Sequence, residues 1–219
     1  MEPDPSLTAL FTLRSLTKAI PLKSILSPSS QMYRLLPVDT SSLDSVRNFA
    51  SSLSALIRSG SVPRIRAIVC AAAVMHLNGK RVTKDGMEAT FQVNYLTNVL
   101  LIMLLLPVMR RDCRIIFLTS NMILAEGAPG GPRLPRFHEY VTKLPDAVME
   151  ETGKSKTFAE GTLRYATSKV LLSMFAAELQ RRLDASNEFS GINVVLLDPG
   201  TFASGMLNGR PSTQPEPSP

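Results

Sequence analysis

Two side chains that could move a proton stand four positions apart in the stretch "LRYATSKVLLSMFAAEL", residues 163–179: Tyr165 and Lys169. In a helix, positions i and i+4 lie on the same face, so the phenol and the ammonium can lean over one patch of surface. A free phenol titrates near pH ~10, and an adjacent ammonium favours phenolate and lowers that pKa. The pair therefore predicts an acid/base site, although the same spacing is common on solvated helix edges. The surrounding elements must decide between the two.

Apolar strands alternate with amphipathic helices along the chain. The predicted strands are "TALFTLRS", "YRLLPVD", "RAIVCAAAVM", "CRIIFLTS" and "INVVLLDPG", and the predicted helices cover 41–60, 86–110 and 163–179. Near-continuous apolar strands separated by helices indicate a parallel sheet that helices cover on both faces, with right-handed crossovers. The sequence thus predicts an α/β fold, a doubly wound parallel sheet of the Rossmann-like kind.

The helix over residues 41–60 has the clearest boundaries. Ser41 and Asp44 form an expected capping box, and Gly60 is the expected stop. Before this helix, the chain between the first two strands reads as a linker rich in Ser, Pro and Lys. Residues 121–161 are too long for a plain connection and are expected to form a lid over a site.

Polar groups follow the ends of several predicted strands, where parallel sheets bind their ligands. Thr119 and Ser120 come after "IIFL", Asp198-Pro199-Gly200 comes after "VVLL", and Asn94 interrupts the apolar face of the long helix. Each group also has an ordinary structural explanation, such as a cap, a turn or a satisfied core amide.

Taken in order, "GMEATFQVNYLTNVLL", "RIIFLTS", "RYATSK" and "INVVLLDPG" resemble the short-chain dehydrogenase/reductase family, especially its fungal branch related to retinol and ketosteroid reductases. The resemblance runs from about Thr8 to Ser204. It implies one partial Rossmann domain over 1–204, followed by a disordered Pro/Ser-rich tail over 205–219.

The resemblance also implies roles for four residues. Tyr165 would be the general acid/base, Lys169 its electrostatic partner and ribose contact, Ser120 the donor to the substrate carbonyl, and Asn94 the holder of a proton-relay water. Hydride transfer to a carbonyl builds negative charge on oxygen, so hydrogen-bond donors and a proton source beside that oxygen suit the reaction.

Five further positions are implied to hold the cofactor, together with Tyr165 and Lys169. The segment "PVDTSSLDSVRNFA" is similar to the one whose aspartate, here Asp39, borders the adenine. Arg14 stands where a family member meets the adenosine 2'-phosphate, which favours NADP over NAD. Pro199, Gly200 and Thr201 would border the nicotinamide.

The family's glycine-rich TGxxxGxG loop after a first strand is not found in this sequence, and "CAAA" replaces an NNAG-like turn. We therefore expect the domain to lack its first strand and helix, and to be truncated at both ends. In the doubly wound order 3-2-1-4-5-6, that strand would lie between "TALFTL" and "RAIVC". Its loss predicts a gap in the sheet and little or no turnover of NADPH.

Composition indicates the size of the core, the cellular compartment and the absence of a predicted membrane span. With 219 residues, 44% of them apolar, the chain can form one sizeable core. Cys70 and Cys113 lie in strand-like runs and are expected to be reduced thiols, and no secretory signal is recognised, so a cytoplasmic protein is expected. The apolar run 99–109 is too short for a membrane span and predicts a core helix. His76 and His138 are expected on the surface.

The net charge of +6 comes from scattered Lys and Arg, which favours an anionic small molecule over nucleic acid. Two hypotheses follow. The first is an NADP-dependent oxidoreductase that interconverts a carbonyl and an alcohol on a small apolar metabolite, in fungal secondary metabolism. The alternative is a catalytically impaired remnant that acts as a pseudoenzyme or binding partner. The all-round apolar surface of helix 86–110 predicts a homodimer.

Overall fold

The computed structural model describes residues 7–26, 32–77, 79–120 and 158–200. The strands are β1 (Ala9–Leu13), β2 (Tyr33–Pro37), β3 (Ile65–Cys70), β4 (Met109–Leu118) and β5 (Asn193–Leu197). The helices are η1 (Leu16–Lys18), α1 (Ile20–Leu26), α2 (Leu43–Arg58), α3 (Ala89–Phe91), η2 (Gln92–Leu96), α4 (Thr97–Leu105), η3 (Leu106–Val108) and α6 (Phe158–Asp184). Most of the expected lid, the tail over 205–219, His138 and Thr201 lie outside the described residues.

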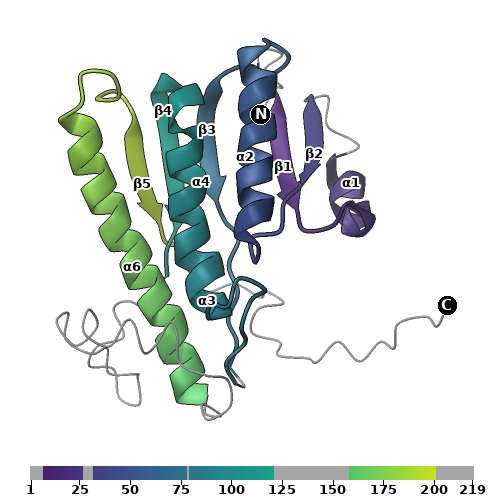
Figure 1. Ribbon diagram of the computed structural model, residues 1–219, viewed down its shortest axis with the longest axis vertical. Helices are drawn as coiled ribbons and strands as arrows, with labels where there is room; N and C mark the ends of the chain where they lie inside the picture. The colour runs from purple at the N-terminus through teal and green to yellow at the C-terminus, as the bar shows by residue number, and fades with distance from the viewer. Residues whose placement is uncertain (1–6, 27–31, 78, 121–157, 201–219) are drawn as a thin grey trace.

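All described strands pair in parallel, as expected for a doubly wound fold. β1 pairs with β2, and β4 lies between β3 and β5. Helices α2, α4 and α6 pack side by side over one face of these strands, and the strands run toward the same end of the molecule (Figure 1). The carboxyl ends of the strands therefore share one edge with the start of α6.

The strands form two sheets rather than one. Within the described part of the chain, β1 is hydrogen-bonded only to β2, and β3 only to β4. β1 and β3 are the strands "ALFTL" and "IRAIVC", between which the sequence predicts a missing strand. The sheet is thus incomplete at the expected place, and its two parts have not closed up.

The core lies between the three-stranded sheet and its covering helices. A single apolar cluster joins residues from α2, α4, β4 and α6, among them Leu53, Ile102, Leu105, Ile115, Phe117 and Leu172. Leu10 of β1 and Ile68 of β3 pack against this same cluster. Side-chain packing, rather than backbone pairing, therefore connects the two sheets.

The long helix expected over 86–110 is shorter and less regular than predicted. It begins at Ala89, passes through a π-helical turn over Gln92–Leu96, and ends in the 3-10 turn Leu106–Val108. Pro107 has no N–H for another helical bond, so the chain turns into β4 at Met109, four residues before the expected strand.

Two smaller predictions were also wrong. The N-cap of α2 is Ser42, whose side chain accepts from the Ser45 N–H, while the Ser41 hydroxyl donates to Asp39 instead. The expected linker after β1 contains η1 and α1, with Pro21 in the first turn of α1, where its missing N–H is tolerated.

The segment Ala89–Val108 is the one helical stretch of the described residues that is long and apolar enough to cross a membrane, with 44% of its window buried. It lies between α2 and α6 (Figure 1), and Ile102 and Leu105 belong to the core. Its outer side is open, because Met103 is 53% exposed and Leu104 is 39% exposed.

The open edge of β1 gives a first testable prediction. The Ala9 N–H donates to the Met32 carbonyl, and the Leu13 carbonyl accepts from Val38. Since backbone groups alternate between the two edges of a strand, Leu10 and Thr12 direct theirs toward the gap. By hydrogen exchange and NMR, we expect their amides to exchange ~10-fold or more faster than those of Phe11 and Leu13.

Equal protection of all four amides would contradict this expectation. It would mean that another segment pairs with the inner edge of β1.

Candidate active site

The candidate site lies at the carboxyl edge of the three-stranded sheet. β4 ends at Leu118, which places Thr119 and Ser120 at this edge, and α6 passes it with Tyr165 and Lys169 in its early turns. Because helix α6 begins at Phe158, both residues lie well inside regular helix, so the i, i+4 relation expected from the sequence holds.

The Ser120 hydroxyl lies within hydrogen-bonding reach of the Tyr165 phenol, and Tyr165 is only 8% exposed. Burial raises the pKa of the Tyr165 phenol, the Ser120 hydrogen bond opposes that rise, and the nearby Asp198 carboxylate adds to it. The structure thus brings a phenol and a hydroxyl together where both can reach one oxygen atom.

Lys169 lies beneath this pair, 3% exposed. Its Nζ donates to the Leu118 carbonyl at 2.7 Å and lies 5.6 Å from the centre of the Tyr165 ring, within the range of a cation–π contact. Burial lowers the pKa of Lys169 from 10.5 to about 8, and the nearby Cys70 thiol opposes that change.

The expectation that Lys169 lowers the Tyr165 pKa was wrong for this structure. The ammonium faces the ring and the Leu118 carbonyl, and burial dominates, so the phenol pKa is raised.

Asn94 is fully buried in the π-helical turn, and its amide is occupied. Its Oδ1 accepts from the Val74 N–H at 2.8 Å, and its Nδ2 donates to the Val74 carbonyl and the Ser168 hydroxyl at 2.9 and 3.0 Å. Its backbone carbonyl accepts from Asn98. Asn94 therefore ties segment 74–77 to α6, and its water-holding role stays a prediction.

The expected adenosine-binding residues meet at the ends of β1 and β2. Arg14 Nε lies 3.5 Å from the Asp39 carboxylate, and Asp39 also accepts from the backbone and hydroxyl of Ser41. Burial acts to raise the Asp39 pKa, but the Ser41 hydrogen bonds and the Arg14 charge outweigh it and lower the pKa. Arg14 remains largely exposed and can reach an incoming anion.

The expected nicotinamide-side residues are described only in part. Pro199 and Gly200 are exposed after β5, and Gly200 has a φ of 71°, in the left-handed region that glycine tolerates. The Gly200 N–H donates to the Asp198 carboxylate at 3.0 Å.

Both cysteines are free and buried, in keeping with reduced thiols. Burial raises the pKa of Cys70 to about 12 and that of Cys113 to about 11. Neither thiol is a candidate nucleophile at neutral pH.

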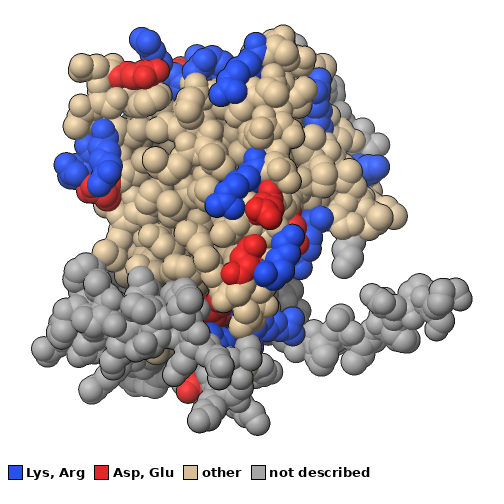
Figure 2. Space-filling model, viewed as in Figure 1, with Lys and Arg blue, Asp and Glu red and all other residues tan. Residues whose placement is uncertain are grey.

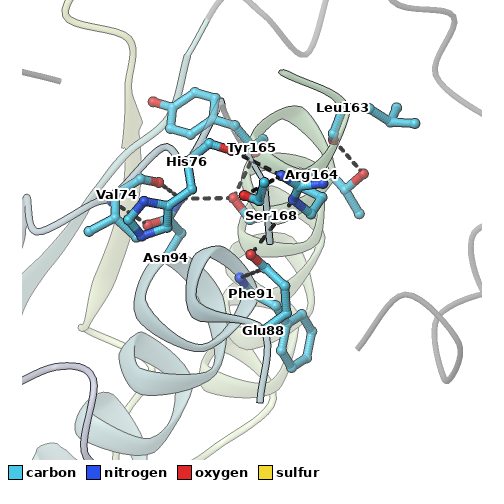
Figure 3. A network of polar contacts seen from close by, with 11 residues as sticks. Val74, His76, Glu88, Phe91, Asn94, Leu163, Arg164, Tyr165 and Ser168 are labelled. Carbon is cyan, nitrogen blue, oxygen red and sulfur yellow. Dashed lines mark hydrogen bonds and ion pairs between the residues drawn. The ribbon is translucent and has the colours of Figure 1, made fainter. Parts of the chain in front are cut away.

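Sequence reasoning missed a cluster of polar residues beside Tyr165, drawn in Figure 3. Arg164 Nε lies 3.7 Å from the Glu88 carboxylate, which is 2% exposed, and Arg164 also donates to the His76 carbonyl. His76, expected on the surface, is half-buried, and burial followed by the Arg81 charge lowers its pKa. Only the position of Arg164 next to Tyr165 could have drawn attention to this cluster.

The similarities to known proteins agree with this geometry. No protein-family model matches the chain. The short-chain dehydrogenase iccH of Talaromyces variabilis is 32% identical over 197 residues, which cover 78% of this chain and 54% of that protein. The short chain dehydrogenase resG of Aspergillus sclerotiorum is 30% identical over 210 residues, covering 89% and 55%. The chain thus spans about half the length of the curated relatives it matches.

Solved structures show the same fold. A metagenomic short-chain oxidoreductase in complex with NADP matches with a TM-score of 0.58 and 18% identity, over 88% of this chain and 71% of that one. None of these similarities supports the alternative of a pseudoenzyme. Together with the ordered site residues, they show that the chain belongs to the short-chain dehydrogenase/reductase family.

Proposed function

We propose that this protein is an NADP-dependent oxidoreductase that interconverts a carbonyl and an alcohol on a small apolar metabolite. The observation that carries the proposal is the placement of the Ser120 hydroxyl within hydrogen-bonding reach of the Tyr165 phenol, beside the buried Lys169. A substrate oxygen placed between the two hydroxyls would receive a hydrogen bond from Ser120 and a proton from Tyr165. NADPH would supply the hydride.

The cofactor assignment rests on charge at the adenosine end. Arg14 is largely exposed beside Asp39, so its guanidinium can pair with a 2'-phosphate. The matching metagenomic oxidoreductase was solved with NADP, which supports the same choice here, with NAD as the alternative. Lys169 would contact the nicotinamide ribose, and Pro199, Gly200 and Thr201 would border the ring.

The setting of this activity is also part of the proposal. Several curated relatives, including the two described above, come from fungi, and this is the ground for proposing a role in fungal secondary metabolism; others come from mouse, zebrafish and chicken. The buried free thiols of Cys70 and Cys113 support a reducing, cytoplasmic location. The catalytic domain would extend over 1–204, with 205–219 as its tail.

The direct test is NADPH oxidation by residues 1–219 with a panel of ketones and aldehydes. Because the gap beside β3 is expected to weaken cofactor binding, NADPH should be varied up to saturation. We expect Tyr165→Phe to lower kcat by ~10² to 10⁴-fold, since it removes the proton donor but leaves the ring in place. Tyr33→Phe, which removes a hydroxyl at the start of β2, is the matched control.

Equal rates for the protein and its Tyr165→Phe variant would contradict the assignment. Absent turnover at every NADPH concentration would overturn the proposed activity for this chain.

The depressed pKa of Lys169 predicts how stability depends on pH. The folded protein releases the Lys169 proton near pH 8 and the unfolded chain near 10.5, so between these values the unfolded chain binds more protons. The quantity to follow is the free energy of unfolding of the protein minus that of the Lys169→Met variant. This difference should be constant below pH 8 and increase by about 3 kcal/mol between pH 8 and pH 10.5. Urea unfolding across this range measures it, and a flat difference would contradict the burial of the charged amine.

We also propose a homodimer through the outer face of α4 and α6. Met103, Leu104 and Met174 are exposed on these helices, and the surface over them carries mainly uncharged side chains (Figure 2). We expect light scattering to give a dimer mass, and Met103→Glu with Met174→Glu to give a monomer. A monomer mass for the unaltered protein at ~100 µM would contradict the proposal, since an interface of standard size holds at lower concentrations.

A further inference from the structure

Helix α6 carries two pairs of residues at i, i+4 spacing, on neighbouring faces. Tyr165 and Lys169 face the candidate site, while Arg164 and Ser168 face α3 and the π-helical turn (Figure 3). Each residue turns the helix by about 100°, so fixing the second face fixes the direction of the first. The direction of the Tyr165 hydroxyl therefore depends on what holds Arg164 and Ser168.

Arg164 is held from two directions. Its Nη2 donates to the carbonyls of His76 and Gly79 at 2.9 and 3.0 Å, and its Nε faces the Glu88 carboxylate at 3.7 Å. Only 14% of the Arg164 side chain is exposed. A planar guanidinium suits this arrangement because its donors point in fixed, diverging directions.

Glu88 is fixed in turn by the helix that it caps. Its Oε2 accepts from the Phe91 N–H at 2.7 Å, which leaves Oε1 for Arg164. The carboxylate therefore belongs to the start of α3, and its charge balances the buried guanidinium.

The close fit of α6 against segment 74–77 also indicates that the orientation of α6 is fixed. A Cβ added to Gly161 would lie 2.6 Å from the Leu77 Cα and 2.7 Å from the His76 carbonyl oxygen. No side chain could occupy that space without moving the backbone of either segment. Gly161 lets the helix approach, and Arg164 then bonds the same backbone one turn later.

We propose that Arg164, together with Glu88, is a positioning pair that sets the rotation of α6 and so aims Tyr165 at Ser120. Arg164 donates to the carbonyls of His76 and Gly79, and Glu88 accepts from the Phe91 N–H, so the pair acts through the position of the helix. Its effect reaches the reaction through the Tyr165 backbone, which lies between Arg164 and the Asn94–Ser168 contact. The inference rests on the proposed function only where turnover is measured.

The test uses two variants. Arg164→Lys keeps the positive charge but removes the planar guanidinium with its several donors. Glu88→Gln keeps a side-chain oxygen that can accept from the Phe91 N–H but removes the negative charge. With NADPH and a carbonyl substrate, we expect kcat to fall ~10²-fold with the KM for NADPH changed less than about twofold. The matched control is Glu178→Gln, which breaks an exposed ion pair with Arg181 on the same helix. It should leave kcat unchanged.

A second readout does not require turnover. Ionisation of Tyr165 can be followed by ultraviolet absorbance as the difference between each protein and its Tyr165→Phe counterpart. We expect Arg164→Lys and Glu88→Gln to lower the Tyr165 pKa toward its ordinary value near ~10, because a rotated helix exposes the phenol. Leu183→Val, a core change at the far end of α6, should lower stability without moving this titration.

The two readouts separate the possible failures. Absent turnover in the unaltered protein overturns the proposed function, and the titration then decides the positioning role alone. An unchanged Tyr165 titration in both variants overturns the positioning pair, even if both variants unfold more easily. If Arg164→Lys does not fold, Glu88→Gln decides the outcome by the same criteria.

Discussion

The buried amide of Asn94 is the interaction on which the site depends. The Asn94 side chain bonds both backbone groups of Val74 and the Ser168 hydroxyl on α6. It thereby joins the segment after β3, the π-helical turn and α6. The Ser168 hydroxyl in turn donates a hydrogen bond to the Tyr165 carbonyl at 2.7 Å. Leaving any of these buried groups unpaired costs about 1–3 kcal/mol, so the arrangement is strongly favoured as a whole.

The second constraint is the parallel direction of every strand. It brings the ends of β1, β2, β4 and β5 to one edge, so Arg14, Asp39, Ser120 and Gly200 share that edge although they are far apart in sequence. Helix α2 makes this possible despite the gap, because its apolar face belongs to the cluster against which Leu10 and Ile68 pack. Backbone pairing alone would not hold the two sheets together.

Much of this could be predicted from the sequence because it depends on local patterns. The period of the apolar residues gave the helices and strands, and the spacing of Tyr165 and Lys169 placed both on one face of α6. The ion pair of Arg164 and Glu88 joins residues 76 positions apart in sequence, and charged side chains ordinarily read as exposed. The π-helical turn was not predicted either, because it depends on a contact between Asn94 and a segment 20 residues earlier in the sequence. The raised Tyr165 pKa depends on burial, which no spacing reveals.

The division into two sheets has a consequence for ligand affinity. A dinucleotide that reached from Arg14 to the edge beyond β5 would touch both sheets and act as a cross-link between them. Any relative motion of the β1–β2 unit would then be lost on binding, and part of the binding free energy would be consumed in stiffening the protein. The net affinity of the dinucleotide, and with it the thermal stabilisation that depends on affinity and ligand concentration, is therefore lower than the contacts alone would give.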